Sequence, residues 1–102
     1  MSKTITHKSP YGGEYQLMAQ FAKYKNNQVA IKLFDLSDGM PYATATLCVE
    51  DYLLTKNEVA IKDYSENEGI LQSLIDAEIV EEPHAFIQSN FVKIPICKLV
   101  NQ

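Results

Sequence analysis

The feature that most constrains the fold is a two-residue alternation of apolar and polar side chains in the first half of the chain. Between residues 14 and 23, the following residues occupy every second position: Tyr15, Leu17, Ala19 and Phe21. Successive side chains of a β-strand point to opposite faces of the sheet, so this period is typical of a half-buried strand. The same period recurs at Val29, Ile31 and Leu33. The first half is therefore predicted to be β-structure.

Turn signals divide this half into four strands. Pro10–Gly13 places a proline before two glycines, and Ser37–Gly39 contains an Asp-Gly pair between apolar runs, which favours a hairpin. Lys25–Asn27 is a third turn. We expect strands at about residues 3–8, 14–23, 29–34 and 41–49, joined as an antiparallel meander.

The second half contains the best helix signal. Ile70, Leu71, Leu74 and Ile75 recur at helical spacing, and Ser65 and Glu68 fit a capping box at the start of this segment. Shorter strands are predicted at residues 58–62, 86–88 and 91–100, with Pro95 at a sheet edge or a strand start. The predicted fold is a single α+β domain over residues 1–102. It is a curved antiparallel sheet of four or more strands, with one amphipathic helix (about 66–78) packed on one face.

The charges are unevenly distributed along the chain. The formal net charge is -4, yet residues 50–82 carry ten acids and two lysines, whereas residues 1–49 and 83–102 each carry a net charge of +2. All nine basic residues are lysines. Arginine is the usual reader of guanine and the usual bidentate partner of phosphate, so its absence and the acidic balance argue against direct nucleic-acid binding.

The N-terminal residues and the cysteines bear on the compartment. Residues 1–8 have no apolar run that would make a signal peptide, and no stretch is long and apolar enough to span a membrane. Cys48 and Cys97 lie in apolar, strand-like runs, where cysteine usually acts as a small hydrophobic residue. We expect a cytoplasmic protein with no membrane partner.

Three blocks carry a resemblance to a known family. Residues 60–69 (Ala-Ile-Lys-Asp-Tyr-Ser-Glu-Asn-Glu-Gly) resemble the central signature of a small bacterial and phage family of unknown function. Residues 38–46 and the closing residues 91–99 are similar to the same family, so that the resemblance extends from about Val29 to Leu99. Its members are often encoded on conjugative elements, plasmids and prophages. The resemblance implies an accessory role on a mobile genetic element and supplies no substrate, cofactor or catalytic residue.

The candidate binding residues are Asp63, Tyr64, Glu66 and Glu68, at the start of the predicted helix. Converging carboxylates there would suit a divalent cation or acid–base chemistry. Acidic residues also favour helix N-termini for structural reasons, which explains Glu66 and Glu68 and leaves Asp63 without a local explanation. We expect no metal site, no cofactor and no catalytic residue.

His7, His84 and the two cysteines show no metal-ligand spacing. A His84–Cys97 nucleophile pair is disfavoured, because Cys97 belongs to a strand and not to a helix N-terminus. Tyr24, between two lysines, is the best candidate for stacking on a nucleic-acid base.

The function favoured by these patterns is that of a non-enzymatic accessory protein of a mobile element. It would bind a host or element protein through the acidic segment 50–82 or an exposed sheet edge, in an anti-defence or transfer role. One alternative is a small metal- or ligand-binding enzyme that uses the acidic cluster, and another is an acidic decoy of a nucleic-acid-binding protein. The partner and the oligomeric state stay open.

Overall fold

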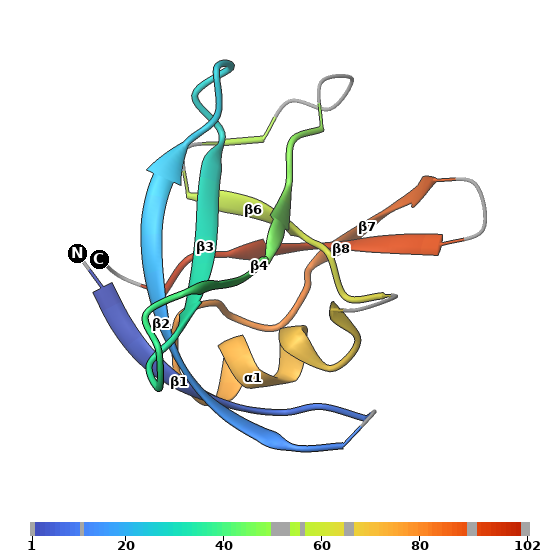
Figure 1. The fold of residues 1–102 in the computed structure, drawn as a ribbon. Coiled ribbons are helices and arrows are strands. Elements are labelled where there is room, and N and C mark those ends of the chain that lie inside the picture. Colours follow the sequence, from blue (N-terminus) through green and yellow to red (C-terminus); the bar gives the residue numbers. More distant parts are fainter. Residues whose placement is uncertain are drawn as a thin grey trace.

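The computed structural model describes residues 2–10, 12–49, 54–55, 57–64, 67–89 and 92–100. They form two four-stranded antiparallel sheets and one helix (Figure 1). Sheet A has the order β1 (Ser2–Lys8), β2 (Glu14–Lys23), β3 (Val29–Asp35) and β4 (Pro41–Thr44). Sheet B has the order β5 (Thr46–Leu47), β6 (Glu58–Ile61), β8 (Val92–Lys98) and β7 (Ala85–Ser89). The helix is α1 (Ile70–Asp76). The α+β class is thereby confirmed.

Sheet A is the predicted meander, and its first turn shows why the sequence folds this way. The Gly12 N–H donates to the Ser9 carbonyl (3.1 Å), and the Ser9 N–H donates to the Gly13 carbonyl (3.0 Å). Gly12 has φ of 107°, a conformation that glycine adopts without steric cost. The turn therefore closes a tight hairpin between β1 and β2.

The strand predicted at residues 41–49 is divided by Ala45, and its two parts belong to different sheets. The Ala45 N–H donates to the Ile31 carbonyl of β3 (2.8 Å), while the Ala45 carbonyl accepts from the N–H of Lys62, next to β6 (2.8 Å). Thr46 reinforces this corner, because its hydroxyl accepts from the Ile31 N–H (3.1 Å). One continuous segment thus joins the two sheets, where the sequence predicted a single curved sheet.

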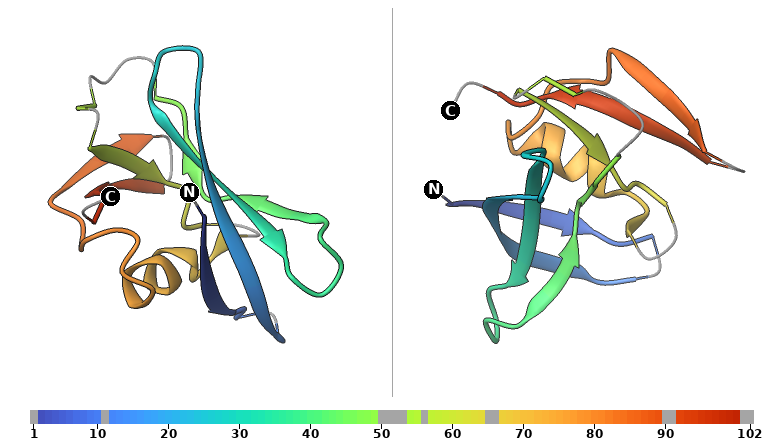
Figure 2. Two further views of the ribbon diagram at one scale, coloured as in Figure 1. Left: turned by 90° about the vertical axis from the view of Figure 1, so that its left-hand side faces the viewer. Right: turned by 90° about the horizontal axis from the view of Figure 1, so that it is seen from above.

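The main core lies between the sheets and α1. Figure 2 shows α1 in the space between β1 and sheet B. Sheet A contributes side chains from the inward positions of the alternating strands, as predicted, and α1 contributes Ile70 and Leu74. The fully buried members include Ile5, Leu17, Ile31, Val59, Ile61 and Ile79.

The helix is shorter than the predicted segment 66–78 and begins later. Its N-cap is Gly69, with φ of 92°, and this residue makes no capping bond of its own. The capping box of Ser65 and Glu68 was a wrong prediction, because Glu68 precedes the N-cap and does not occupy the third helical position. Ser65 and Glu66 lie outside the described residues. At the other end, Glu78 has φ of 60°, which a helical residue does not adopt.

The predicted strands 86–88 and 91–100 correspond to β7 and β8, with Phe91 outside the described residues. Pro95 lies inside β8, which is not an edge strand of sheet B. The pairing of β8 with β6 ends at Ile96, so that Pro95 pairs with Phe86 of β7 alone. A residue that cannot donate to the ladder is tolerated there. Within the described ranges, no helix is long and apolar enough to cross a membrane.

Candidate functional site

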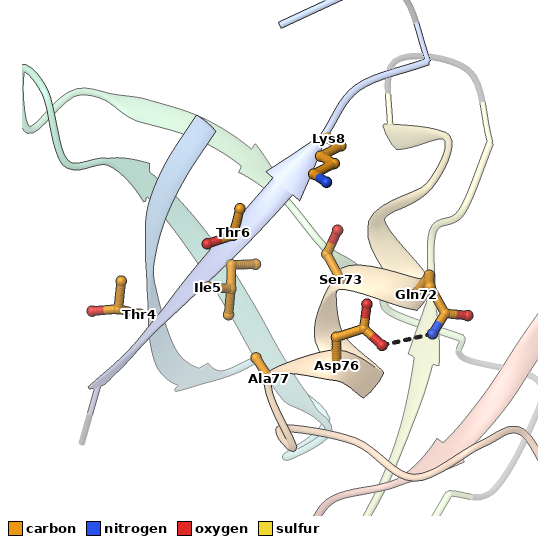
Figure 3. A pocket seen from close by; sticks show the side chains of 8 residues that line it. All are labelled: Thr4, Ile5, Thr6, Lys8, Gln72, Ser73, Asp76 and Ala77. Atoms are coloured by element: carbon orange, nitrogen blue, oxygen red, sulfur yellow. Dashed lines mark hydrogen bonds between the residues drawn. The ribbon is translucent and has the colours of Figure 1, made fainter. Parts of the chain in front are cut away.

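A groove of about 490 Å³ runs between β1 and α1 (Figure 3). Its two walls come from segments far apart in the sequence, which the fold places side by side. The strand wall consists of Thr4, Ile5, Thr6 and Lys8, and the helix wall of Gln72, Ser73, Asp76 and Ala77. We call these eight residues the β1–α1 groove.

The strand wall is an open sheet edge. In an antiparallel pair, residues that exchange backbone hydrogen bonds alternate with residues whose N–H and C=O groups point away from the partner strand. The bond from the Ser9 N–H to the Gly13 carbonyl fixes the phase of this alternation, since Ser9 and Gly13 continue the β1–β2 register. The outward-pointing residues of β1 are therefore Thr4, Thr6 and Lys8.

These outward groups face the groove. The strand order leaves β1 at the edge of sheet A. In the part of the chain that the structure describes, no backbone hydrogen bond joins β1 to an element other than β2. Backbone N–H and C=O groups at such an edge are a template for another strand.

Two polar contacts from β1 hold α1 at the distance that keeps the groove open. The Lys3 ammonium donates to the Glu78 carbonyl (3.3 Å), just beyond the C-terminal end of the helix. The His7 Nδ1 and the Ser73 hydroxyl form a buried hydrogen bond of 2.8 Å. Because Lys3 and His7 lie four residues apart on β1, these contacts fix α1 at its middle and just beyond its C-terminal end.

The start of α1 lies against β1 at Gly69. A Cβ atom at this position would lie 3.5 Å from the His7 Cε1 and 3.7 Å from the Lys8 carbonyl oxygen. The φ of 92° also places the residue in the region that glycine favours. The distances are those of ordinary contacts, so the backbone conformation and not a lack of space favours glycine at this residue.

His7 is fully buried and is held neutral by its surroundings. Burial lowers the pKa of the imidazole below its usual value of 6.5, and the negative charge of Asp63 partly opposes this effect. The ring lies edge-on to Tyr42, at 5.9 Å between centroids. Its Nε2 has no hydrogen-bond partner within the described ranges. A serine–histidine–carboxylate relay needs a carboxylate bonded to the second ring nitrogen, so this pair lacks the third member of such a relay.

The helix wall adds an acidic group to the groove. The Asp76 carboxylate accepts from the Gln72 side-chain amide (2.8 Å), and both side chains are exposed (Figure 3). Lys8 lies on the opposite wall, close to the start of the helix. One end of the groove is therefore basic and the other acidic.

Asp63, which had no local explanation in the sequence, is the capping group of the helix. Its Oδ1 accepts from the backbone N–H groups of Gly69 (3.1 Å) and Leu71 (3.0 Å). Glycine at the N-cap has no side chain to fill this role, so a carboxylate six residues upstream supplies it. These two amides are among the donors that a helix leaves unpaired at its start.

The other candidate binding residues are Tyr64, Glu66 and Glu68. The Lys62 ammonium lies 5.7 Å from the centroid of the Tyr64 ring, at the distance of a cation–π contact. Glu68 is exposed, and Glu66 lies outside the described residues. Across the residues that the structure describes, no group of three or more His, Cys, Asp or Glu side chains could hold a metal ion.

The cysteines and His84 were the other candidates for chemistry, and the His84 N–H donates to the carbonyl of Ile96, next to Cys97 in β8 (3.1 Å). Both thiols are free, with Cys97 buried and Cys48 exposed. Burial raises the pKa of the Cys97 thiol to about 12, so Cys97 is not a nucleophile at neutral pH. The imidazole of His84 bonds to the Glu58 carboxylate at 2.6 Å. This contact and the Thr55 N–H, which is the stronger cause, lower the pKa of Glu58.

Tyr24, the candidate for base stacking, has a structural role. Its hydroxyl lies 3.1 Å from both the carbonyl oxygen and the side-chain oxygen of Thr46. The tyrosine therefore ties the β2–β3 hairpin to the corner between the sheets.

Comparison with known proteins gives no match: no family model fits the chain, and no curated protein or solved structure is significantly similar to it.

The groove residues were not identified from the sequence. Apolar and polar side chains alternate only weakly along residues 3–8, and this pattern does not indicate that β1 pairs with another strand on one side only. The polar–apolar period of α1 was visible, but the facing of Ser73 toward His7 was not. The one available signal was the histidine within the predicted strand at residues 3–8, since a histidine that becomes buried usually needs a polar partner.

Proposed function

We propose that the protein binds an extended segment of a partner protein, which adds as a further strand to the free edge of β1 in the β1–α1 groove. The observation that carries the proposal is the outward direction of the Thr4, Thr6 and Lys8 backbones along a groove with a helix as its second wall. Strand addition of this kind obtains affinity from main-chain hydrogen bonds and specificity from alternate side chains.

The dimensions of the groove suit a short peptide. Residues 4–8 extend over roughly 16 Å at about 3.3 Å per residue, which corresponds to about five residues of an added strand. Every second side chain of that strand would face α1. There it would meet Ala77, whose apolar side chain favours an apolar residue at that position.

The charges of the groove indicate what kind of segment fits. Asp76 and Lys8 favour a basic residue at one end of the segment and an acidic residue at the other. The amides of Gly69 and Leu71 are already bound by Asp63. They therefore add no donor beside the Lys8 ammonium for a free C-terminal carboxylate, and we infer that an internal segment binds.

This proposal makes the protein a non-enzymatic interaction module. The resemblance of residues 60–69 to proteins of mobile elements favours a partner from the element or its host, in the cytoplasm. The enzyme alternative has less support, because Asp63 is engaged by backbone amides.

The proposal is tested with Thr6→Pro and a matched control, Thr6→Ala. Proline removes the outward N–H of residue 6 without removing a hydrogen bond to β2, and an edge position tolerates it. Both variants lose the bond from the Thr6 hydroxyl to the Gln16 side chain (3.0 Å), so that only proline changes the edge. Peptides selected from a random display library against the wild type are then compared by NMR.

We expect the selected peptides to protect the amides of Thr4, Thr6 and Lys8 from hydrogen exchange. The amides of Ile5 and His7 should be protected before the peptide is added. Thr6→Ala should bind the peptides and Thr6→Pro should not. The proposal is wrong if the selected peptides bind Thr6→Pro as tightly as the wild type, or if the selection yields no peptide that protects these amides.

A further inference from the structure

A buried hydrogen bond between His7 and Ser73 joins the two walls of the β1–α1 groove. Ser73 lines the groove, and so do Thr6 and Lys8, the neighbours of His7 on β1. Figure 3 shows Ser73 on the side of α1 that faces β1. A change in the protonation state of His7 therefore acts on the contact between the strand wall and the helix wall.

The hydrogen bonds around this pair fit a neutral imidazole. The Ser73 hydroxyl lies 2.8 Å from the His7 Nδ1 and 3.3 Å from the Gly69 carbonyl oxygen. It has one hydrogen and can accept from Nδ1 while it donates to the carbonyl. With this assignment the imidazole N–H is at Nδ1. The lone pair is at Nε2, which has no hydrogen-bond partner in the described part of the chain.

Protonation adds a second N–H to His7, at a position without an acceptor. The side chain is fully buried, and both a buried charge and a buried donor without a partner destabilise the folded state. The imidazolium is therefore more stable where water reaches the ring. The element that can move to admit water is α1, because no backbone hydrogen bond joins it to β1 among the described residues.

The charges around the ring offset this cost only in part. Burial is the larger effect and lowers the pKa of His7, while the negative charge of Asp63 raises it. Asp63 lies just before α1, and its Oδ1 accepts from the amides of Gly69 and Leu71. The remaining titratable groups on the elements packed around His7 are Tyr15 of β2, Tyr42 of β4, Lys8 of β1, Asp76 of α1 and Glu68 before α1. The last three are exposed, and burial raises the pKa of Tyr42, which stays uncharged.

From these observations we propose that protonation of His7 loosens α1 from β1 and so releases a segment bound in the β1–α1 groove. The inference rests on the proposed function, because the released segment is the one that adds to β1. The closed groove needs a neutral imidazole, so binding of the segment releases a proton from His7. Lowering the pH therefore weakens binding, by at most about tenfold per pH unit for one group.

The free protein is tested first, by NMR between pH 7.5 and 5.0. We expect relaxation dispersion at the amides of Gly69 and Ser73 to increase as the ring signal of His7 titrates, since this method detects opening on the microsecond to millisecond scale. His7→Asn has no titrating ring and should abolish the increase. The matched control is His84→Asn, which removes the other imidazole of the chain, bonded to Glu58 and outside the groove lining.

The peptides selected against the groove are then titrated by calorimetry at pH 7.5 and 5.0, in two buffers that differ in ionisation enthalpy. Peptides without histidine are used. The wild type and His84→Asn should bind about threefold or more weakly at pH 5.0 and should release a proton on binding, as one linked group requires. His7→Asn should show neither effect beyond what the peptide itself contributes. In the wild type, the peptide should lower the pKa read from the His7 ring signal.

The outcomes separate the two proposals. Binding at pH 7.5 that weakens at pH 5.0 through His7 supports both of them. Equal affinity at the two pH values, or the same loss in His7→Asn, overturns the inference and leaves the groove as a binding site. If no peptide binds at pH 7.5, the proposed function fails, and the dispersion of the free protein decides whether His7 opens the groove. If His7→Asn does not fold, a ring titration of the wild type that the peptide leaves unchanged overturns the inference.

Discussion

Replacing Asp63 by alanine is expected to destabilise the start of α1 and, with it, the wall of the β1–α1 groove. The side chain is half-buried, and its Oδ1 accepts two backbone N–H groups, at 3.1 and 3.0 Å. Removing a helix-capping side chain costs about 0.5–2 kcal/mol. Because this carboxylate serves two amides, we expect a loss of about 2 kcal/mol, which lowers the Tm of a domain of this size by about 8 °C or more.

The measurement is urea and thermal unfolding of Asp63→Ala, Asp63→Asn and Glu68→Ala. Asparagine retains one side-chain oxygen and should recover part of the loss. Glu68→Ala is the matched control, because it removes the same charge one residue before Gly69 and leaves both bonds of Asp63 in place, so it should cost less than Asp63→Ala. If the two alanine variants are equally stable, the charge and not the hydrogen bonding stabilises the helix, and the reasoning is refuted.

Two further predictions concern pH and divalent cations. The pKa of His7 is lowered in the folded state. As the pH falls below about 6.5, the unfolded chain therefore takes up a proton at this residue before the folded chain does. Stability should therefore decrease between pH 7.5 and 5.5, by no more than about 1.4 kcal/mol per pH unit, and His7→Asn should abolish most of this slope in urea unfolding. Millimolar Ca²⁺, Mg²⁺ or Mn²⁺ should leave the Tm unchanged. A saturable rise of several degrees that Asp63→Asn removes would instead establish a cation site.

The strands of sheet A could be predicted because alternation and turn residues are local signals. Leu17, Ala19, Ile31 and Leu33 are all buried, as their positions in the alternation require. The division at Ala45 was not visible, because Thr and Ala residues on both sides of it suit an uninterrupted strand. Which sheet each half joins is determined by partners from β3 and β6, far away in the sequence.

The start of the helix was misjudged because the capping group is distant. Ser65 and Glu68 have the spacing of a capping box, and no local rule points to Asp63, six residues before the N-cap. The acidic cluster was identified from the sequence, but the role of Asp63 as the capping group could be seen only in the structure. The groove could not be predicted at all, since an open strand edge is a property of the strand order.

The passage of one segment through both sheets at Ala45 has a consequence for folding cooperativity. The main core takes side chains from β1–β3, from β6 and β8 and from α1, so that neither half of the chain can form this core alone. Fragments cut at residue 45 should therefore remain unfolded separately and regain structure only when mixed. In the intact chain, the slowest-exchanging amides of both sheets should open together, with one free energy, as a single cooperative unit.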